Sequence, residues 1–343
     1  MVTIFCEVEE LEADTLLKLY GDLDYDVFKE PLNADNAKRC VDAEIISTFI
    51  YSDLSRKTLE QLRNLKFITT RSRSVDHIDL DYCAEKDIAV SNVPAYGEHT
   101  VAEHVFCLLL ALNRQLPKVV QQTREGNFSL RGVTGFDLYG KTFGVIGTGA
   151  IGLRAIEIAH GFGMNVLGHD VQVRPDTAKK LGFGYVSLDE LLARSDVVSL
   201  HVSTASGNRP VLGEREFSLM KEGATIINTS RGSAIDLKAL LQALSKGKVR
   251  AAGLDVLPDE PAIRDDAEFL RESFSEHHDA ATVLTSHALL RHKNVIVTPH
   301  SAFYTHETVE SILRTTGENI EAYMAGQPQN VVRASSLLKW QFK

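Results

Sequence analysis

The stretch K-T-F-G-V-I-G-T-G-A-I-G, residues 141–152, decides the fold of this chain. Residues 142–146 form a short apolar run that predicts a buried strand, and apolar residues at helical spacing follow the stretch. Between the two, Gly147, Gly149 and Gly152 stand in a G-x-G-x-x-G frame. The first glycine permits a tight turn, the second lets backbone approach a pyrophosphate, and the third lets the helix pack close to the strand. The stretch therefore predicts a strand, a turn that binds a dinucleotide, and a helix; a purely structural turn is the alternative.

The acid that follows the next strand discriminates between NAD and NADP. The first helical turn, with Ala150 and Ile151, points free N–H groups at the phosphates. Residues 164–169 predict a second strand, and Asp170 follows it, 18 residues after the last glycine. An acid about 20 residues after the glycines is typical of dinucleotide-binding folds. A carboxylate there accepts a hydrogen bond from a ribose 2′-hydroxyl and repels a 2′-phosphate. We therefore expect NAD as the cofactor, while Arg174 keeps NADP open as an alternative.

The composition is that of a globular protein of about two domains, with 343 residues, 44% of them hydrophobic and 24% charged. The net charge of −9, without any basic run, argues against nucleic acid as a partner. The longest apolar run, residues 105–112, is far shorter than the ~18 residues of a membrane span. Residues 2–6 predict a strand rather than a signal peptide. We therefore expect a cytoplasmic protein that binds no membrane.

The cysteines stand far apart without a C-x-x-C pair, at positions Cys6, Cys40, Cys83 and Cys107. Such a distribution is typical of reduced, buried thiols. We expect neither a disulfide framework nor a metal site.

Strand and helix patterns alternate along the chain, which predicts parallel sheets covered by helices. Residues 1–95 follow this alternation without a phosphate-binding glycine loop, so we expect them to hold the substrate. Residues 99–122 predict one long helix that leads into a nucleotide domain with six strands. The last predicted helix, residues 303–325, returns to the first domain. The predicted domains are a discontinuous substrate domain, 1–98 plus 302–343, and an NAD-binding Rossmann domain, 99–301.

Residues 262–293 form an excursion that is longer than an ordinary connection. Residues 265–274 predict an acidic helix, and His277, His278 and Asp279 follow it. Because no third group of ligands stands nearby at a helical spacing, we expect a solvated loop rather than a metal site.

Three side chains in the second half of the chain have the chemistry that reduces a 2-keto acid. That reaction needs a cation for the carboxylate, a proton donor for the carbonyl oxygen, and a hydride from the cofactor. Arg231 follows a predicted strand and offers a planar guanidinium that matches a carboxylate. His300 follows another strand, and an imidazole with a pKa of about 6.5 gives and takes protons near neutral pH. Glu260 would hold the other ring nitrogen and raise that pKa.

Taken one by one, these residues also fit a surface ion pair, a loop histidine and a solvated acid. Together, at the strand ends of one sheet, they predict an active site. By contrast, His104 falls within a predicted helix, and we expect it to serve in helix packing.

Four motifs follow one another along the chain: G-T-G-A-I-G at 147–152, N-T-S-R-G at 228–232, G-L-D-V-L-P-D-E-P at 253–261 and T-P-H-S-A-F-Y-T at 298–305. In this order they resemble the D-isomer-specific 2-hydroxyacid dehydrogenases. V-P-A-Y at 93–96 and the H-S-A-F-Y-T stretch look most like the D-lactate dehydrogenases of that family.

The resemblance implies two Rossmann-like or flavodoxin-like doubly wound α/β domains with a cleft between them, NAD in the cleft, and usually a homodimer. It assigns substrate binding to Arg231, acid–base catalysis to His300, and support of the histidine to Glu260. It also places Asp255 against the nicotinamide carboxamide, with a helix cap or loop acid as the alternative.

Further residues near these motifs are candidates for binding. We expect His201 to line the cofactor cleft and Thr229 to contact the cofactor through its backbone. We expect Tyr96 to point its hydroxyl at the small acid, a packed interface tyrosine being the alternative. Phe303 and Tyr304 are expected to wall the substrate pocket, with core packing as the alternative.

One pair of residues departs from the family pattern. Relatives commonly carry an apolar residue and a glycine before the aspartate of D-H-I-D, and their backbone amides hold the substrate carboxylate. Here Arg73 and Ser74 precede Val75 and Asp76. Serine still presents an N–H group but lacks glycine's access to positive φ. Arg73 adds a cation beside the acid group, as in phosphite dehydrogenase, a relative; the alternative is that Arg73 turns outward to a carboxylate such as Asp76.

The sequence thus predicts an NAD-dependent oxidoreductase that reduces a small 2-keto acid to the D-2-hydroxy acid, with pyruvate and D-lactate as the first choice. One alternative is a related dehydrogenase for glyoxylate, hydroxypyruvate, a bulkier 2-keto acid, or phosphite through Arg73. Another is a non-catalytic binder that senses NAD, similar to the corepressors of this fold.

Overall fold

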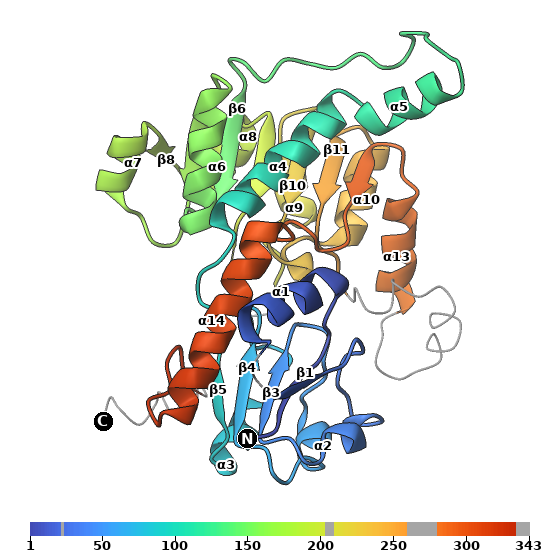
Figure 1. Ribbon diagram of the computed structural model, residues 1–343. Helices are drawn as coiled ribbons and strands as arrows, with labels where there is room; N and C mark the ends of the chain where they lie inside the picture. The colour runs from blue at the N-terminus through green and yellow to red at the C-terminus, as the bar shows by residue number, and fades with distance from the viewer. Residues whose placement is uncertain (22–23, 203–208, 259–279, 334–343) are drawn as a thin grey trace. The chain divides into compact units, whose positions relative to one another are not determined.

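The computed structural model describes residues 1–21, 24–202, 209–258 and 280–333 of the chain (Figure 1). Contacts between Cα atoms divide it into two compact units, Met1–Gly97 with Phe303–Lys343, and Glu98–Ala302. Each unit is built on one parallel sheet covered by helices, so the predicted α/β fold class is confirmed.

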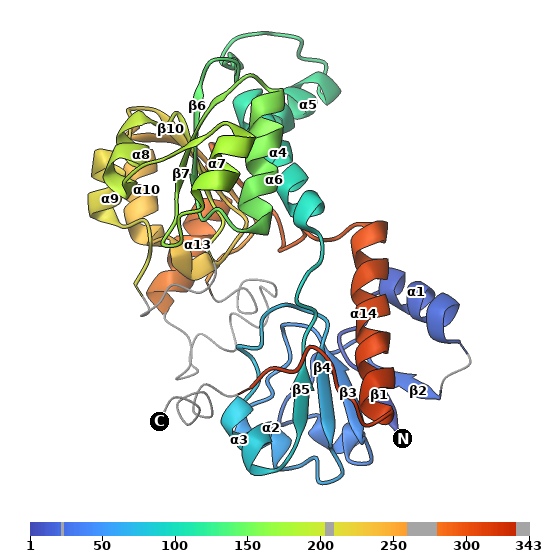
Figure 2. The same cartoon turned by 90° about the vertical axis from the view of Figure 1, so that its left-hand side faces the viewer.

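The first unit contains a five-stranded parallel sheet with the order β2-β1-β3-β4-β5, which is the flavodoxin-like order. Its strands are β1 (Thr3–Phe5), β2 (Tyr25–Val27), β3 (Ile45–Thr48), β4 (Phe67–Thr70) and β5 (Ala89–Ser91). Its helices are α1 (Glu10–Tyr20), α2 (Arg56–Leu59), α3 (Leu80–Glu85) and α14 (His306–Met324), with a 3₁₀ turn at Ala37–Cys40. Figure 2 shows α1 and α14 side by side at one face of this sheet.

Alternation along the strands places apolar side chains on both faces of this sheet. Phe5 and Phe67 pack beneath α1 and α14 with Leu16 and Leu313, whereas Ile4 and other neighbours belong to the core on the opposite face. Because both faces are covered, these strands read as continuous apolar runs.

The second unit contains a seven-stranded parallel sheet with the order β12-β11-β10-β9-β6-β7-β8. Its strands are β6 (Thr142–Ile146), β7 (Asn165–His169), β8 (Gly184–Tyr185), β9 (Val197–Leu200), β10 (Ala224–Asn228), β11 (Val249–Leu254) and β12 (Val295–Val297). Its helices are α4 (Glu98–Asn113), α5 (Leu116–Arg124), α6 (Ala150–Gly161), α7 (Pro175–Leu181), α8 (Leu188–Arg194), α9 (Glu214–Leu219), α10 (Leu237–Ser245) and α13 (Ala280–Leu290), with a 3₁₀ turn at Gly232–Ala234. The strand order reverses between β6 and β9, and ligands of doubly wound sheets bind at the carboxyl end of such a switch point.

Helices cover both faces of the second sheet as well. Helices α4 and α6 lie side by side on one face, where Phe106 and Ile156 join the core around Phe143 and Val145 (Figure 1). Helices α8, α9, α10 and α13 contribute to the core on the other face.

Several expected elements were wrong in detail. The predicted helix 99–122 is two helices, because Gln115 adopts a left-handed φ of 48° and Pro117 then stands in the first turn of α5. The second sheet has seven strands rather than six, since the two-residue strand β8 pairs with β7. Strand β2 was also missed, and its three residues are too short to show a pattern.

The excursion at 262–293 is only partly described. Helix α13 occupies its second half and buries Leu289 in the core of the second unit, which the expectation of a loop had missed. The predicted helix 265–274 and the histidines at 277 and 278 lie outside the described residues.

Three further features bear on the early expectations. Cys107 is exposed rather than buried, while the other three cysteines are buried free thiols. In the described part of the chain, no helix combines the length and the apolar character needed to cross a membrane. No three His, Cys, Asp or Glu side chains gather there as metal ligands would.

Candidate active site

The turn between β6 and α6 has the geometry that its glycines predict. Gly147 has a φ of +94°, and a Cβ added there would lie 2.5 Å from the carbonyl oxygen of His201. A Cβ on Gly152 would lie 2.1 Å from the carbonyl oxygen of Gly147, so the helix can pack this closely only without a side chain. Gly149, the N-cap of α6, has open space at its Cβ position. The backbone at Gly149 is therefore accessible beside the helix N-terminus, which includes Ala150 and Ile151 in its first turn.

Asp170 follows β7 directly and reaches back to this turn. Its carboxylate accepts hydrogen bonds from the backbone N–H of Thr148 at 2.6 Å, the Thr148 hydroxyl at 3.0 Å, and the backbone N–H of Gln172 at 2.9 Å. Partial burial opposes ionisation, but these hydrogen bonds and the charge of Arg174 outweigh it and hold the pKa of Asp170 below its usual value. The acid is thus an anion beside the glycine turn.

His201 follows β9 at the switch point of the sheet. Its ring Nε2 lies 2.9 Å from the hydroxyl of Ser199, and its carbonyl group lies against Gly147. Burial lowers the pKa of His201 to about 4, so the imidazole is neutral near neutral pH.

The loop after β10 carries Arg231 and is shaped by a residue that the sequence analysis did not single out. Asn228, buried at the strand end, accepts from the backbone and hydroxyl of Ser230 and donates to the carbonyl oxygen of Arg231 at 2.8 Å. A Cβ on Gly232 would lie 2.2 Å from the backbone carbon of Leu257, so the loops after β10 and β11 pack directly together. Asparagine is a common turn former, and this property could have marked Asn228.

Asp255 follows β11 and holds the loop after β12. Only 1% exposed, its carboxylate accepts from the Thr298 hydroxyl at 2.5 Å and from the backbone N–H groups of Ser301 and Ala302 at 2.9 and 3.0 Å. The backbone N–H of His300 donates to the carbonyl oxygen of Asp255 at 2.9 Å. In this structure the Asp255 carboxylate is therefore engaged by protein groups.

His300 has a φ of +53°, a strained conformation for a residue other than glycine. The bonds from Asp255 to its neighbours stabilise this conformation. His104 from α4 adds to the network, because its Nε2 lies 3.1 Å from the Thr298 hydroxyl and 3.5 Å from a carboxylate oxygen of Asp255. His104 is thus more than a packing residue, and its position in the sequence gave no sign of this contact.

A buried hydroxyl at the same sheet edge tests whether the residues fit a cofactor. The hydroxyl of Thr229, directly after β10, is buried and has no hydrogen-bond partner among the described residues. Buried polar groups are usually satisfied, so an orphan at the carboxyl end of β10, in the sheet that also bears the glycine turn, fits a site that a polar ligand completes.

The first unit holds the other candidates. Arg73 and Ser74 lie in the loop after β4, where the Ser74 hydroxyl donates to Asp76 at 2.7 Å. The φ angle of Ser74 is not positive, so the backbone conformation at this position does not require glycine. Phe303 lies 5.2 Å from Phe49 between ring centroids, and further aromatic rings surround it: Tyr96 at 6.3 Å and Tyr304 at 5.7 Å.

The structure thus brings together the candidates of each unit. In the second unit, the glycine turn, Asp170, His201, Arg231, Asp255 and His300 all follow the carboxyl ends of strands in one parallel sheet. Glu260 lies outside the described residues.

Comparisons with known proteins agree with this arrangement. Residues 106–302 match the model of the NAD-binding domain of D-isomer-specific 2-hydroxyacid dehydrogenases. The chain is 38% identical to a 2-hydroxyacid dehydrogenase homolog of Haemophilus influenzae over 327 residues, covering 93% of this chain and 95% of the relative. It is also 38% identical to the D-lactate dehydrogenase of Escherichia coli over 300 residues, covering 86% and 88% of the two chains.

A solved structure extends the comparison. D-lactate dehydrogenase from Aquifex aeolicus, complexed with NAD and lactic acid, superimposes with a TM-score of 0.80 at 37% identity, covering 95% of this chain and 96% of that one. The carboxyl-edge site, the family model and these relatives agree, and the chain belongs to the D-isomer-specific 2-hydroxyacid dehydrogenases, enzymes that use NAD.

Proposed function

We propose that this enzyme reduces pyruvate to D-lactate, or another small 2-keto acid to its D-2-hydroxy acid. The observation that carries the proposal is the placement of Arg231, Asp255 and His300 after three adjacent strands of the sheet that also bears the glycine turn. Relatives named D-lactate dehydrogenase support pyruvate as the first substrate to test.

Arg231 binds the carboxylate of the substrate in this proposal. Its guanidinium is planar and offers paired N–H donors that match two carboxylate oxygens. The loop that carries it is fixed by buried Asn228 and by the close packing of Gly232, so the cation is presented from a rigid support.

His300 donates a proton to the carbonyl oxygen during reduction and accepts it during oxidation. The nicotinamide of NADH supplies the hydride. Asp255 holds the loop that presents His300. Support of the imidazole is assigned to Glu260 by the resemblance to the family.

The second unit would bind NAD along its carboxyl edge. The N-terminus of α6, with Gly149, Ala150, Ile151 and Gly152, receives the pyrophosphate. Asp170 accepts from the ribose hydroxyls.

Three further side chains contact the rest of the cofactor in this proposal. His201 lines its site as a neutral imidazole, and Thr229 and Asp255 lie beside the nicotinamide end.

The first unit carries further groups suited to a small acid. No acceptor among the described residues takes the backbone N–H of Arg73 or Ser74, so both remain available to an anionic ligand. Tyr96, Phe303 and Tyr304 supply an aromatic wall for the short side chain of the acid.

We also propose a homodimer formed through the second unit. Phe128, Leu130 and Tyr139 lie in the segment before β6 and are 79%, 84% and 81% exposed, which is unusual for large apolar side chains. A hollow of about 360 Å³ between α4 and α6, lined in part by Phe106 and Leu110, adds apolar surface to the same unit. Light scattering tests this proposal: replacing Phe128 and Leu130 by serine should give a monomer.

The reaction is tested by NADH oxidation with a panel of 2-keto acids, followed by chiral analysis of the product. We expect pyruvate to be turned over and D-lactate to be the product. L-lactate as the product, or no turnover with any acid despite NADH binding, would contradict the proposal; the second outcome favours a non-catalytic NAD binder.

Exposed Arg73 supports a second choice of substrate, an acid with additional negative charge. The same panel therefore includes hydroxypyruvate, glyoxylate, a dicarboxylic 2-keto acid and phosphite, with the wild type and Arg73→Ala. If Arg73 binds substrate, the variant should lose the more anionic acids and retain pyruvate.

A further inference from the structure

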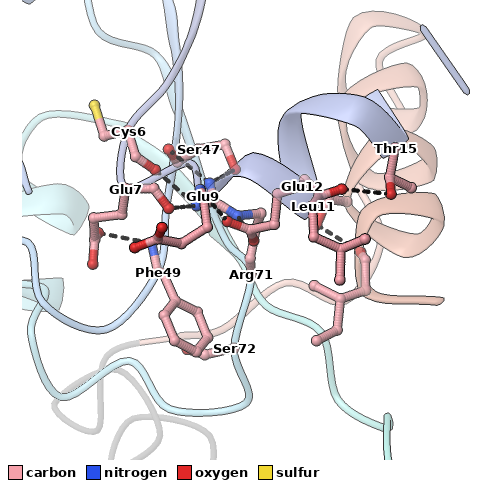
Figure 3. A network of polar contacts seen from close by, with 12 residues as sticks. Cys6, Glu7, Glu9, Leu11, Glu12, Thr15, Ser47, Phe49, Arg71 and Ser72 are labelled. Atoms are coloured by element: carbon pink, nitrogen blue, oxygen red, sulfur yellow. Dashed lines mark hydrogen bonds and ion pairs between the residues drawn. The ribbon is translucent and has the colours of Figure 1, made fainter. Parts of the chain in front are cut away.

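A buried arginine ties together the strand ends of the first unit. Arg71 follows β4, is 0% exposed, and donates through Nε to Glu12 at 3.1 Å. Its Nη1 donates to the Ser47 hydroxyl at 3.1 Å, and its Nη2 donates at 2.7 Å to the carbonyl oxygens of both Cys6 and Glu7 (Figure 3). One guanidinium thus fixes the carboxyl ends of β1, β3 and β4 relative to helix α1.

One of the residues held by this network is Glu7, which follows β1. Glu7 has a φ of +58°, and such strain in a residue other than glycine persists only where the surroundings enforce it. Arg71 donates to the carbonyl oxygen of Glu7. The side chain of Glu7 points to the loop after β3, where it accepts a hydrogen bond from Phe49 (dashed line in Figure 3). Left-handed, strained residues of this kind cluster at functional sites.

The carboxylate of Glu7 organises the loop after β3. It accepts from the backbone N–H of Phe49 at 2.9 Å, from the backbone N–H of Tyr51 at 2.7 Å, and from the buried hydroxyl of Ser52 at 2.5 Å. Three donors converge on a group that only accepts, so an ionised carboxylate satisfies all of them. The positions of Phe49 and Tyr51 therefore depend on Glu7.

These two aromatic residues belong to a cluster of rings around Phe303. The ring of Phe49 lies 6.0 Å from that of Tyr51 and 5.2 Å from that of Phe303, and Phe303 in turn contacts Tyr96. If this cluster walls the side-chain pocket of the acid, its shape is set by the loop that Glu7 holds.

We propose that Glu7, locked by Arg71, is a positioning residue that sets how large a side chain the 2-keto acid may carry. This inference rests on the proposed function of the enzyme. Glu7 itself touches neither substrate nor cofactor in this account; it acts by holding the backbone from which the aromatic wall projects.

The test is Glu7→Gln. This substitution keeps the size of the side chain but replaces one accepting oxygen by an NH₂ group, which faces the three donors of Phe49, Tyr51 and Ser52. At least one of the N–H groups of Phe49 and Tyr51 then loses its acceptor, and the loop shifts. We expect the ratio of kcat/KM for pyruvate to that for phenylpyruvate to change by about tenfold through KM, because a small misplacement of the wall alters binding of the side chain. The dissociation constant for NADH and kcat with saturating pyruvate should stay within about twofold.

The matched control is Glu85→Gln in the same unit, since Glu85 makes an exposed ion pair with Arg56 at 2.9 Å. It should leave the selectivity ratio unchanged. If Glu7→Gln does not fold, Ser52→Ala removes one partner of the carboxylate and should move the ratio in the same direction by a smaller factor.

An unchanged ratio in a folded Glu7→Gln enzyme, or a change equal to that of Glu85→Gln, would overturn the inference. A wild-type enzyme that turns over no keto acid would instead contradict the proposed function. The two failures are therefore distinguishable.

Discussion

The two units of this enzyme use the same kind of parallel sheet and prepare its carboxyl edge in opposite ways. In the second unit, glycines clear space: Gly147 and Gly152 have no room for a side chain, and Gly149 leaves an open backbone at a helix N-terminus. In the first unit, buried charges fill the corresponding edge, where Arg71 and Glu7 hold the loops by side-chain hydrogen bonds.

The proposed function offers a reason for this difference. A pyrophosphate is bound by backbone N–H groups and a helix dipole, which requires close approach and therefore glycine. A small acid requires loops held in one shape, and buried, fully hydrogen-bonded ionic groups are one means of fixing loops. We therefore expect changes in the second unit to alter turnover and cofactor binding, and changes in the first unit to alter the choice of acid.

The largest effect should come from His300→Ala in the second unit. Loss of a general acid–base group lowers rates by about 10²–10⁴-fold, so kcat for pyruvate should fall by that factor. The dissociation constant for NADH, measured by fluorescence, should remain within about twofold, since no cofactor contact is assigned to His300.

The exposed His160→Ala enzyme is the control for this substitution. Loss of NADH binding together with turnover would show that His300 has a structural role, and the assignment of chemistry to the second unit would then lose its main support.

The glycine turn should separate stability from cofactor binding. Gly152→Ala forces a Cβ to 2.1 Å from a backbone oxygen, and such overpacking costs about 1–3 kcal/mol or more. Gly149→Ala meets no atom within 4 Å, so the fold should tolerate it, while NADH should bind about tenfold more weakly because backbone approach is blocked.

Gly161→Ala, in the same helix and with open space at its Cβ, is the matched control and should be neutral or slightly stabilising. Urea unfolding and NADH titration of the three variants measure both quantities. Equal destabilisation by the substitutions at Gly149 and Gly152 would show that the open space at Gly149 is not reserved for a ligand.

The features that sequence could predict are those set by local chemistry. The apolar run, the three glycines and the following helix depend on neighbouring residues, so the β6–α6 turn and the class of both sheets could be read from the chain. Strand β8 and the break at Gln115 could not, because a two-residue strand shows no period and glutamine, unlike glycine, is not a residue type that marks a left-handed φ.

The contacts around the site were harder to predict for a different reason. Charged residues are rarely buried, so Glu7 and Arg71 would be placed on the surface by any local rule, although the structure buries both. Their pairing joins strands that are far apart in the sequence. His104 and Asp255 illustrate the same point, since a helix and a strand end meet only in the folded chain.

We expect a moderate effect on the choice between NADH and NADPH, because the proposed cofactor contacts lie in the second unit alone. Asp170→Asn removes the negative charge that repels a 2′-phosphate and leaves Arg174 beside the turn, with its Nη1 3.4 Å from the carbonyl oxygen of Thr148. The ratio of kcat/KM for NADPH to that for NADH should rise by about tenfold. The exposed Asp176→Asn changes the same charge in the nearby helix α7 and should leave the ratio unchanged. A shift of similar size in both variants would indicate a general field effect rather than contact with the ribose.

The smallest effect concerns the pH dependence of stability, in which the two units should be alike. Burial lowers the pKa of His77 in the first unit to about 4, against the opposing charge of Asp76, and burial also lowers the pKa of His201 in the second unit to about 4. Each histidine therefore binds a proton less readily in the folded state than in the unfolded state, where its pKa is about 6.5. The folded state is favoured fully above pH 6.5 and loses this advantage as the pH falls toward 4, because unfolding then takes up protons.

Calorimetry between pH 4 and 7 checks this expectation. At about pH 5, unfolding of His77→Asn or of His201→Asn should take up about one proton fewer than unfolding of the wild type, and Tm should fall less steeply with acid. His160→Asn, a substitution at an exposed position, is the control for the change of residue. If only one of these two partly buried histidines contributes, the two sheet edges differ in solvent access as well as in the groups that build them, because an imidazole reached by water would titrate alike in the folded and unfolded chains.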